Sequence, residues 1–244
     1  MARSKCAAIR VTRRAGVTAV RLSRAERYNA LDNASLQGLA DVLEQPTAGP
    51  LVLSGEGDIF SVGPDIDELS RLDGAGARTY SLLAHRVCDL LERWPGVTIA
   101  HIAGYCLGSG LELALACDVV AGQSGLRIGM PGLAWAMVPC MGGLARLGAR
   151  VAAGTTSRLF LNGDVLEAPE AERLRLIDRQ VGSSAEVDDL ARDMAEWSPS
   201  AVTAIRSLRL ARRLRIDVET EAALFAQPFA TGECQKRLKE LLAG

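Results

Sequence analysis

Several kinds of feature are missing from this sequence, and each absence excludes a class of protein. No stretch reaches about 18 uncharged apolar residues, the length that a membrane-spanning helix needs. The basic start, residues 1–14, has no long apolar segment, so we expect no targeting signal there. The formal net charge is only -1, and nothing in the overall charge favours a nucleic acid or an anionic membrane as a partner.

Cysteine motifs and sequence repeats are also absent. The six cysteines form no CxxC pair and lie mostly within apolar stretches, so the sequence predicts neither a disulfide framework nor a metal site. Reduced thiols indicate a cytoplasmic protein. The two histidines, His85 and His101, have no partner in a motif, and we expect them to pack or form hydrogen bonds rather than contact a substrate.

The pattern of apolar residues alternates between strands and helices. With 244 residues, of which 48% are hydrophobic, the chain can bury one sizeable core. We predict an α/β core over residues 1–181 and a C-terminal helical tail over 182–244, with Gly182-Ser183-Ser184 as the linker. Helices are expected to dominate from Ala145 to the end of the chain. The core elements predicted before that point are strands within 7–22, at 50–54, 97–103, 118–121 and near 126–129, and helices at 32–43, 76–93 and from 111.

The most informative stretch is the glycine turn Gly108-Ser109-Gly110, which joins a strand-like run to a helix-like one. Glycines let the backbone turn sharply and leave peptide N–H groups exposed at the start of the helix, where they attract developing negative charge. Glu112 lies within the first helical turn, so we expect its carboxylate to face the same small volume. The stretch therefore predicts an anion hole with a base beside it.

Four segments resemble the crotonase family, also called the enoyl-CoA hydratase/isomerase family. Residues 24–31 are similar to the segment that opens the family's site, and residues 60–66 to its first oxyanion loop. Residues 102–112 resemble the second oxyanion loop, and residues 128–143 the loop that ends the site. The segments follow in the family's order, so the resemblance implies a ββα spiral core with a C-terminal helical region that serves for trimerisation or as a lid.

The resemblance also implies a chemistry and a set of residues. An acyl-CoA or acyl-carrier thioester would react through an enolate, with no cofactor beyond the coenzyme A of the substrate, in a homotrimer or a dimer of trimers. The N–H groups of residue 64 and Ser109 would hold the thioester oxygen. The implied catalytic residues are Ser109, Glu112 and Cys140; the implied substrate-binding or coenzyme-binding residues are Arg24, Arg27, Ala30, Val62, Gly63, Pro64, Asp65, Ile66, Gly108, Gly132 and Trp135.

Two residues depart from the family's pattern. Residue 64 is proline, which has no amide hydrogen, and the loss of one oxyanion donor typically costs about 10²- to 10³-fold in rate. The family's hydratases place a second glutamate where this chain has Gly132, and the isomerases depend mainly on that carboxylate. The sequence therefore predicts a slow hydratase and weakens the assignment as an isomerase.

Several candidate residues keep two interpretations. Cys140 is either a reactive thiol or a small side chain that fills a turn. Glu112 is either a site residue or a buried hydrogen-bonding group. Asp65 either caps a helix or lies near the thioester, and Trp135 either shapes the acyl pocket or packs.

A cluster of arginines lies at residues 206–215. At helical spacing Arg206, Arg209 and Arg213 share a face, which is either a solvated surface or, by resemblance, a site for the coenzyme's phosphates. Arg24 and Arg27 are similar candidates for phosphate binding.

Two classes of function remain open. The first is an acyl-thioester lyase or isomerase that catalyses hydration, dehydration, isomerisation or decarboxylation, and Glu112 and the glycine turn favour it. The second is a degenerate member that binds acyl thioesters or a partner protein, and Pro64 and Gly132 favour it. We favour an enzyme of unusual specificity whose acyl-pocket walls come from the helix at 69–91 and the C-terminal tail.

Overall fold

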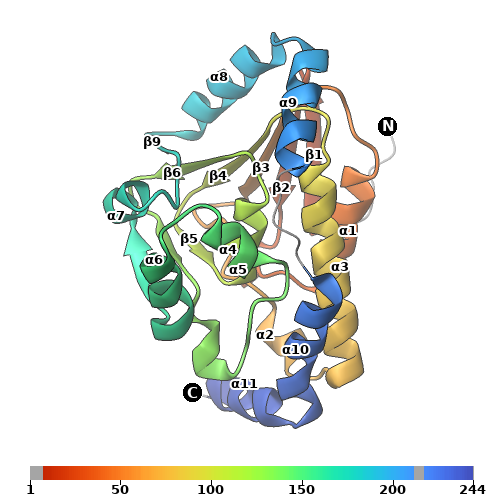
Figure 1. Ribbon diagram of the computed structural model, residues 1–244, viewed down its shortest axis with the longest axis vertical. Helices are drawn as coiled ribbons and strands as arrows, with labels where there is room; N and C mark the ends of the chain where they lie inside the picture. The colour runs from red at the N-terminus through yellow and green to blue at the C-terminus, as the bar shows by residue number, and fades with distance from the viewer. Residues whose placement is uncertain (1–7, 212–216, 244) are drawn as a thin grey trace.

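A sheet of mostly parallel strands forms the core of the molecule (Figure 1). The structure is a computed structural model and describes residues 8–211 and 217–243. β1 (Ile9–Arg14) pairs antiparallel with β2 (Val17–Leu22), as the hairpin-like opening predicts. The other strands add in parallel in the order β1-β2-β3-β4-β6-β9, where β3 is Leu51–Gly55, β4 Thr98–Ile102, β6 Val119–Gln123 and β9 Arg179–Val181.

The burial of each strand fits its position in the sheet. Every residue of β4 is buried, which is typical of a parallel strand covered on both faces. β1 lies at the edge and exposes Arg10, Arg13 and Arg14, and charged side chains on an edge strand discourage pairing with another chain.

A second, smaller sheet lies beside the first. It has the order β5-β7-β8, where β5 is Tyr105–Leu107, β7 Arg127–Gly129 and β8 Val165–Glu167. The backbone turns between β4 and β5 at Gly104, which has a φ of 51°. The strand predicted at 97–103 is confirmed as β4. β5 follows it in the other sheet, and α4 (Ser109–Leu115) begins after Gly108.

Two helices lie along one side of the main sheet, and one of the C-terminal helices packs against the longer of them (Figure 1). α1 (Asn33–Leu43) packs on α3 (Gly74–Glu92), and α10 (Val218–Ala230) lies along the other end of α3, where Phe225 stacks on Tyr80. α11 (Glu233–Ala243) runs beneath α10 and contacts α2 (Ile66–Leu69). The predicted tail is thus packed on the core.

The remaining helices connect and cover the two sheets. α8 (Ser184–Ala195) packs over β2 to β4, where Val187 and Ala191 form a second apolar cluster with Val52 and Ile99. The other segments are η1 (Ala25–Arg27), η2 (Pro131–Trp135), α5 (Gly143–Gly148), α6 (Ala153–Ser157), the π-helical turn η3 (Arg158–Asn162), α7 (Ala168–Arg173) and α9 (Pro199–Ala211). Among the helices of the described residues, none combines the length and apolar character needed to cross a bilayer.

Local signals predicted most elements correctly. α1 begins after Asp32, whose carboxylate accepts a hydrogen bond from Ser35 N at 2.7 Å, as expected of an N-cap. Helices dominate after Ala145 as predicted, and the sequence analysis missed only two short strands there, β8 and β9. Each is three residues long, too short to show an alternating pattern, and each is stabilised by pairing with a strand formed earlier in the sequence.

Arg206 is buried, contrary to its interpretation as part of a solvated face. Its guanidinium donates to the carbonyl oxygens of Leu91, Glu92 and Trp94 at the C-terminal end of α3, and it also pairs with Asp118. A cation at this end of a helix satisfies free carbonyls and interacts favourably with the helix dipole. Arg209 pairs with Asp118 from the surface, and Arg213 lies outside the described residues.

Replacing Arg206 by methionine should lower the free energy of unfolding by about 2–4 kcal/mol, because several buried acceptors lose their donor. Urea unfolding of the variant measures this loss. Arg209→Met is the matched control: its side chain is exposed, so the expected cost is below about 1 kcal/mol. Equal losses of unfolding free energy in the two variants would contradict a stabilising role for the buried hydrogen bonds of Arg206.

Candidate active site

An apolar cavity of about 300 Å³ lies between α4 and the segment that runs from η2 to η3. Four of the candidate residues line it, namely Pro64, Gly108, Ser109 and Gly132. Its other lining residues are Met130, Leu133, Met137, Val138, Pro139, Leu144, Thr156, Ser157, Phe160 and Leu161. The cavity thus has the size and apolar character of a small-molecule binding pocket.

Ser109 brings a free backbone donor to the cavity. Gly108 has a φ of 51° and a ψ of -126°, a conformation that favours glycine, and this turn starts α4 at Ser109. Within the part of the chain that the structure describes, no protein acceptor bonds to the N–H of Ser109. The predicted donor is therefore available to a ligand at the cavity wall.

Pro64 stands beside this donor. It forms a parallel bridge with Leu31, which holds residues 63–65 against the loop before α1. Its Cδ lies 3.6 Å from the position that a Cβ on residue 108 would take, so the ring atom attached to the nitrogen points toward the glycine turn. A ring carbon thus occupies the direction in which another residue would direct an N–H group.

Glu112 is enclosed behind the cavity wall. Its Oε1 accepts hydrogen bonds from Met141 N at 3.0 Å and Gly143 N at 2.8 Å, and its Oε2 accepts one from Cys140 N at 3.3 Å. The residue is 1% exposed and is not among those that line the cavity. The prediction that Glu112 and Ser109 face one volume is therefore wrong in this structure, because a buried carboxylate needs donors and the loop 140–143 provides them.

The environment of Glu112 changes its acidity. Burial raises its pKa to about 7, and the nearby Glu221 acts in the same direction, while the backbone hydrogen bonds from the loop lower it. Both protonation states are therefore populated near neutral pH. This property is typical of groups that take up and return a proton in catalysis.

Cys140 packs rather than forming a reactive thiolate. Its Sγ lies 3.7 Å from Ser109 Oγ in a buried position, and burial raises the pKa of the thiol well above its usual value. A nucleophilic cysteine needs a lowered pKa. The geometry therefore favours the interpretation of Cys140 as a side chain that fills the turn.

Charged residues in and next to the first two motif segments form an ion-pair network. Arg24 contacts Asp32 at 3.0 Å and Asp65 at 2.9 Å, and Arg27 pairs with Asp67 and lies 3.6 Å from Asp65. Asp65 also caps α2, where it accepts a hydrogen bond from Glu68 N at 3.2 Å. The capping interpretation of Asp65 is confirmed, and both arginines already have carboxylate partners.

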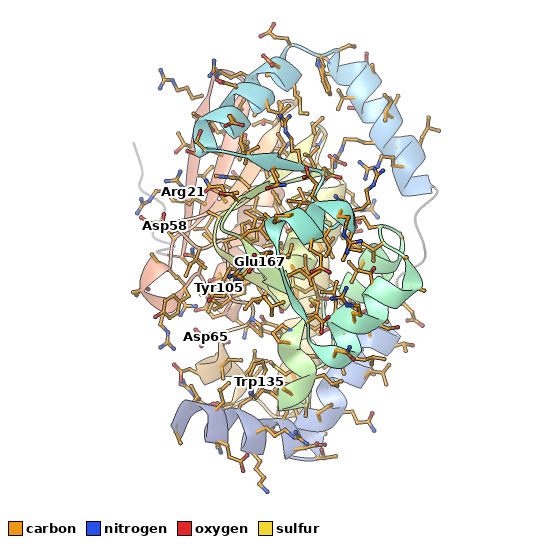
Figure 2. All side chains as sticks on the ribbon, turned by 90° about the vertical axis from the view of Figure 1, so that its left-hand side faces the viewer. Arg21, Asp58, Asp65, Tyr105, Trp135 and Glu167 are labelled. Atoms are coloured by element: carbon orange, nitrogen blue, oxygen red, sulfur yellow. The ribbon has the colours of Figure 1, made fainter. Side chains whose placement is uncertain are left out.

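The other candidates lie outside the cavity lining. Ala30 and Gly63 are buried, and Val62 and Ile66 are partly buried around the Leu31–Pro64 bridge. Trp135 ends η2, packs on the main core and lies near α11 (Figure 2). It therefore packs rather than shaping the acyl pocket.

The walls of the cavity differ from those expected. No residue of α3 or of residues 217–243 lines it; η2, the loop 137–139, Leu144 and residues 156–161 do. The motif at 128–143 covers the first part of this wall. Thr156, Ser157, Phe160 and Leu161 belong to no motif, so the motifs gave no signal for this part of the wall. In the structure Leu144 and Leu161 are exposed apolar residues there.

Neither histidine contacts the cavity. His101 lies 3.2 Å from Gln123 through its Nε2, and His85 lies 3.4 Å from Glu221. In the described residues, no group of three or more His, Cys, Asp or Glu side chains is placed to hold a metal ion. The polar groups placed at the cavity include the backbone donor of Ser109 and the hydroxyl-bearing residues Thr156 and Ser157, and the carboxylate of Glu112 lies behind the wall.

Comparisons with known proteins show the family of this chain. The profile of the enoyl-CoA hydratase/isomerase family matches residues 12–240. The chain is 30% identical over 242 residues to the 2,3-dehydroadipyl-CoA hydratase of Escherichia coli, covering 95% of this chain and 94% of that protein. It is 28% identical to the short-chain-enoyl-CoA hydratase of Clostridium acetobutylicum over 226 residues, 89% of this chain and 85% of that protein.

Solved structures share the fold. The crystal structure of an enoyl-CoA hydratase/isomerase from Mycobacterium paratuberculosis superimposes with a TM-score of 0.89, covering 96% of this chain and 98% of that chain at 20% identity. At that identity the match concerns the fold alone, and it confirms the predicted spiral core with C-terminal helices. The chain therefore belongs to the enoyl-CoA hydratase/isomerase family, the crotonases.

Proposed function

We propose that the chain is an enzyme that binds an acyl-CoA, or the same acyl group on a carrier, with the acyl group in the apolar cavity. The thioester oxygen accepts a hydrogen bond from Ser109 N–H, which stabilises the enolate as charge develops. The observation that carries the proposal is the free N–H of Ser109 at the wall of the apolar cavity. The printed names of the relatives support an enoyl-CoA as substrate.

Glu112 is the proposed acid or base of this reaction. Its pKa of about 7 lets it hold or release a proton near neutral pH. Pro139 and Leu144 flank its loop and line the cavity, so the carboxylate lies one layer of residues behind the wall. Proton transfer to a bound acyl group then requires the loop 140–143 to release the carboxylate.

Three observations favour a second candidate, an acyl-thioester binding protein with little turnover. Pro64 provides no second donor, Gly132 provides no second carboxylate, and Glu112 is already bonded to the loop. In either case a homotrimer or dimer of trimers in the cytoplasm, with no cofactor beyond the coenzyme of the substrate, remains part of the proposal.

A panel of enoyl-CoA and malonyl-type CoA esters distinguishes the candidates. The enzyme should turn over at least one ester, and Glu112→Gln should abolish that turnover while the Kd for the ester, measured by calorimetry, changes little. Micromolar binding without turnover would favour the binding protein. Turnover that survives the substitution would exclude Glu112 as the acid or base, and the absence of both binding and turnover would contradict both candidates.

A further inference from the structure

The loop 140–143 uses all four of its consecutive backbone N–H groups on carboxylates. Three of them donate to Glu112, as described above. The fourth, Gly142 N, donates to Glu221 Oε1 at 2.5 Å. Glu112 belongs to the central helix α4 and Glu221 to α10, so the loop is held between the core and the C-terminal part of the chain.

The carbonyl oxygens of the same loop are bonded as well. Ser81 Oγ on α3 donates to Cys140 O at 2.9 Å, and Arg146 on α5 donates to Met141 O. Arg146 in turn forms a bidentate pair with Glu92, with distances of 3.0 and 2.9 Å. A Cβ on residue 143 would overlap the Glu112 side chain, so the loop lies directly against the carboxylate.

Glu221 reaches this position from well outside the motif segments. Its side chain is 18% exposed, and its Oε1 also lies 3.4 Å from His85 Nε2, a buried nitrogen that has no hydrogen-bond partner in the described residues. Among the described residues, Gly142 N donates to no other side chain. The contact is therefore the one hydrogen bond between α10 and the loop backbone in the part of the chain that the structure describes.

We propose that Glu221 is a positioning residue of the site: by holding Gly142 N it fixes the loop 140–143 over Glu112 and so sets how firmly that carboxylate is retained. This inference rests on the proposed function only for its catalytic consequence. The positioning itself is a property of the unliganded chain.

The charges around Glu112 support this role. The groups that face it are Tyr80 and Cys88 on α3, Cys140 on the loop, Arg146 on α5 with its partner Glu92, and Glu221 on α10 with His85 beside it. Glu221 is the carboxylate among them that raises the pKa of Glu112. Because like charges disfavour the ionised form, neutralising Glu221 should make Glu112 more acidic.

Hydrogen exchange followed by mass spectrometry tests the positioning. Glu221→Ala removes the acceptor and should speed exchange of the peptide covering residues 140–143 by about tenfold or more. Glu221→Gln keeps an acceptor oxygen and should show a smaller increase. Glu219→Gln is the matched control, because Glu219 is on the same helix but pairs with Arg78 at the surface. In Glu219→Gln the peptide covering residues 140–143 should exchange at the wild-type rate.

Carbon NMR of glutamate-labelled protein measures the titration midpoint of Glu112, which a merely structural role of Glu221 would not change. With Glu112→Gln used to assign the resonance, the titration midpoint of Glu112 should shift downward in Glu221→Gln and stay unchanged in Glu219→Gln. The acid limb of any acyl-CoA turnover should follow the same shift. Unchanged exchange in Glu221→Ala, or an unchanged midpoint in folded Glu221→Gln, would overturn the proposal. Absence of acyl-CoA turnover in the wild type would count only against the proposed function.

Discussion

Replacing Pro64 by alanine should raise the turnover number for an enoyl-CoA substrate by about 10²- to 10³-fold, the usual effect of one oxyanion donor. Pro64 lines the cavity, and the ring carbon on its nitrogen points toward the glycine turn that positions Ser109. An alanine at residue 64 directs an N–H group along that line. The thioester oxygen then has two backbone donors instead of one, and the gain appears mainly in kcat because charge develops in the transition state.

Steady-state kinetics on the wild type and two variants measure this gain. Pro139→Ala is the matched control, since Pro139 lines the same cavity but lies outside the predicted oxyanion segments 60–66 and 102–112. A similar increase in both variants would mean that loosening the wall, rather than the new donor, raises the rate. No increase in Pro64→Ala would show that residue 64 does not face the reacting oxygen.

The second large effect concerns the stability contributed by Glu112. Glu112→Ala should lower the free energy of unfolding by about 2–4 kcal/mol at neutral pH, because buried N–H groups of the loop 140–143 lose their acceptor. Glu112→Gln should cost less, since the amide oxygen can replace Oε1 and the amide nitrogen then replaces Oε2, which accepts only the longest bond. Urea unfolding of both variants measures the difference.

The same carboxylate makes the free energy of unfolding fall as the pH rises towards neutrality. The pKa of Glu112 is raised from 4.5 to about 7, so the folded protein binds more protons than the unfolded chain between these values. The stabilisation from its protonated form is complete below about pH 4.5 and falls as the pH rises to about 7, with a loss of about 3 kcal/mol. Unfolding curves across this window should show the decline in the wild type and a flatter dependence in Glu112→Gln. Identical slopes in the two proteins would contradict the raised pKa.

Features governed by local chemistry could be predicted from the sequence. The glycine turn before Ser109, the caps at Asp32 and Asp65 and the missing donor at Pro64 each depend on a residue type and its immediate neighbours. The motif segments also indicated the family and the spiral core. These parts needed no knowledge of how distant segments meet.

Features that depend on contacts between distant segments could not be predicted. Glu112 was expected to face the cavity, and the loop 140–143 covers it instead. Arg206 was interpreted as part of a solvated or phosphate-binding face, yet it is buried and donates to carbonyl oxygens at the end of α3. The short strands β8 and β9 exist only because neighbouring strands pair with them. In each case a buried polar group or a free backbone edge selected a partner that local patterns do not encode.

The cavity draws its wall from separate parts of the chain. Ser109 and Pro64 contribute the part where the thioester is proposed to react, whereas Phe160 and Leu161 come from η3, far along the sequence. Substitutions in η3 can therefore alter the length or branching of the accepted acyl group without disturbing the backbone that binds the oxygen. Substrate preference and chemical mechanism are thus free to diverge independently as such a scaffold acquires new roles.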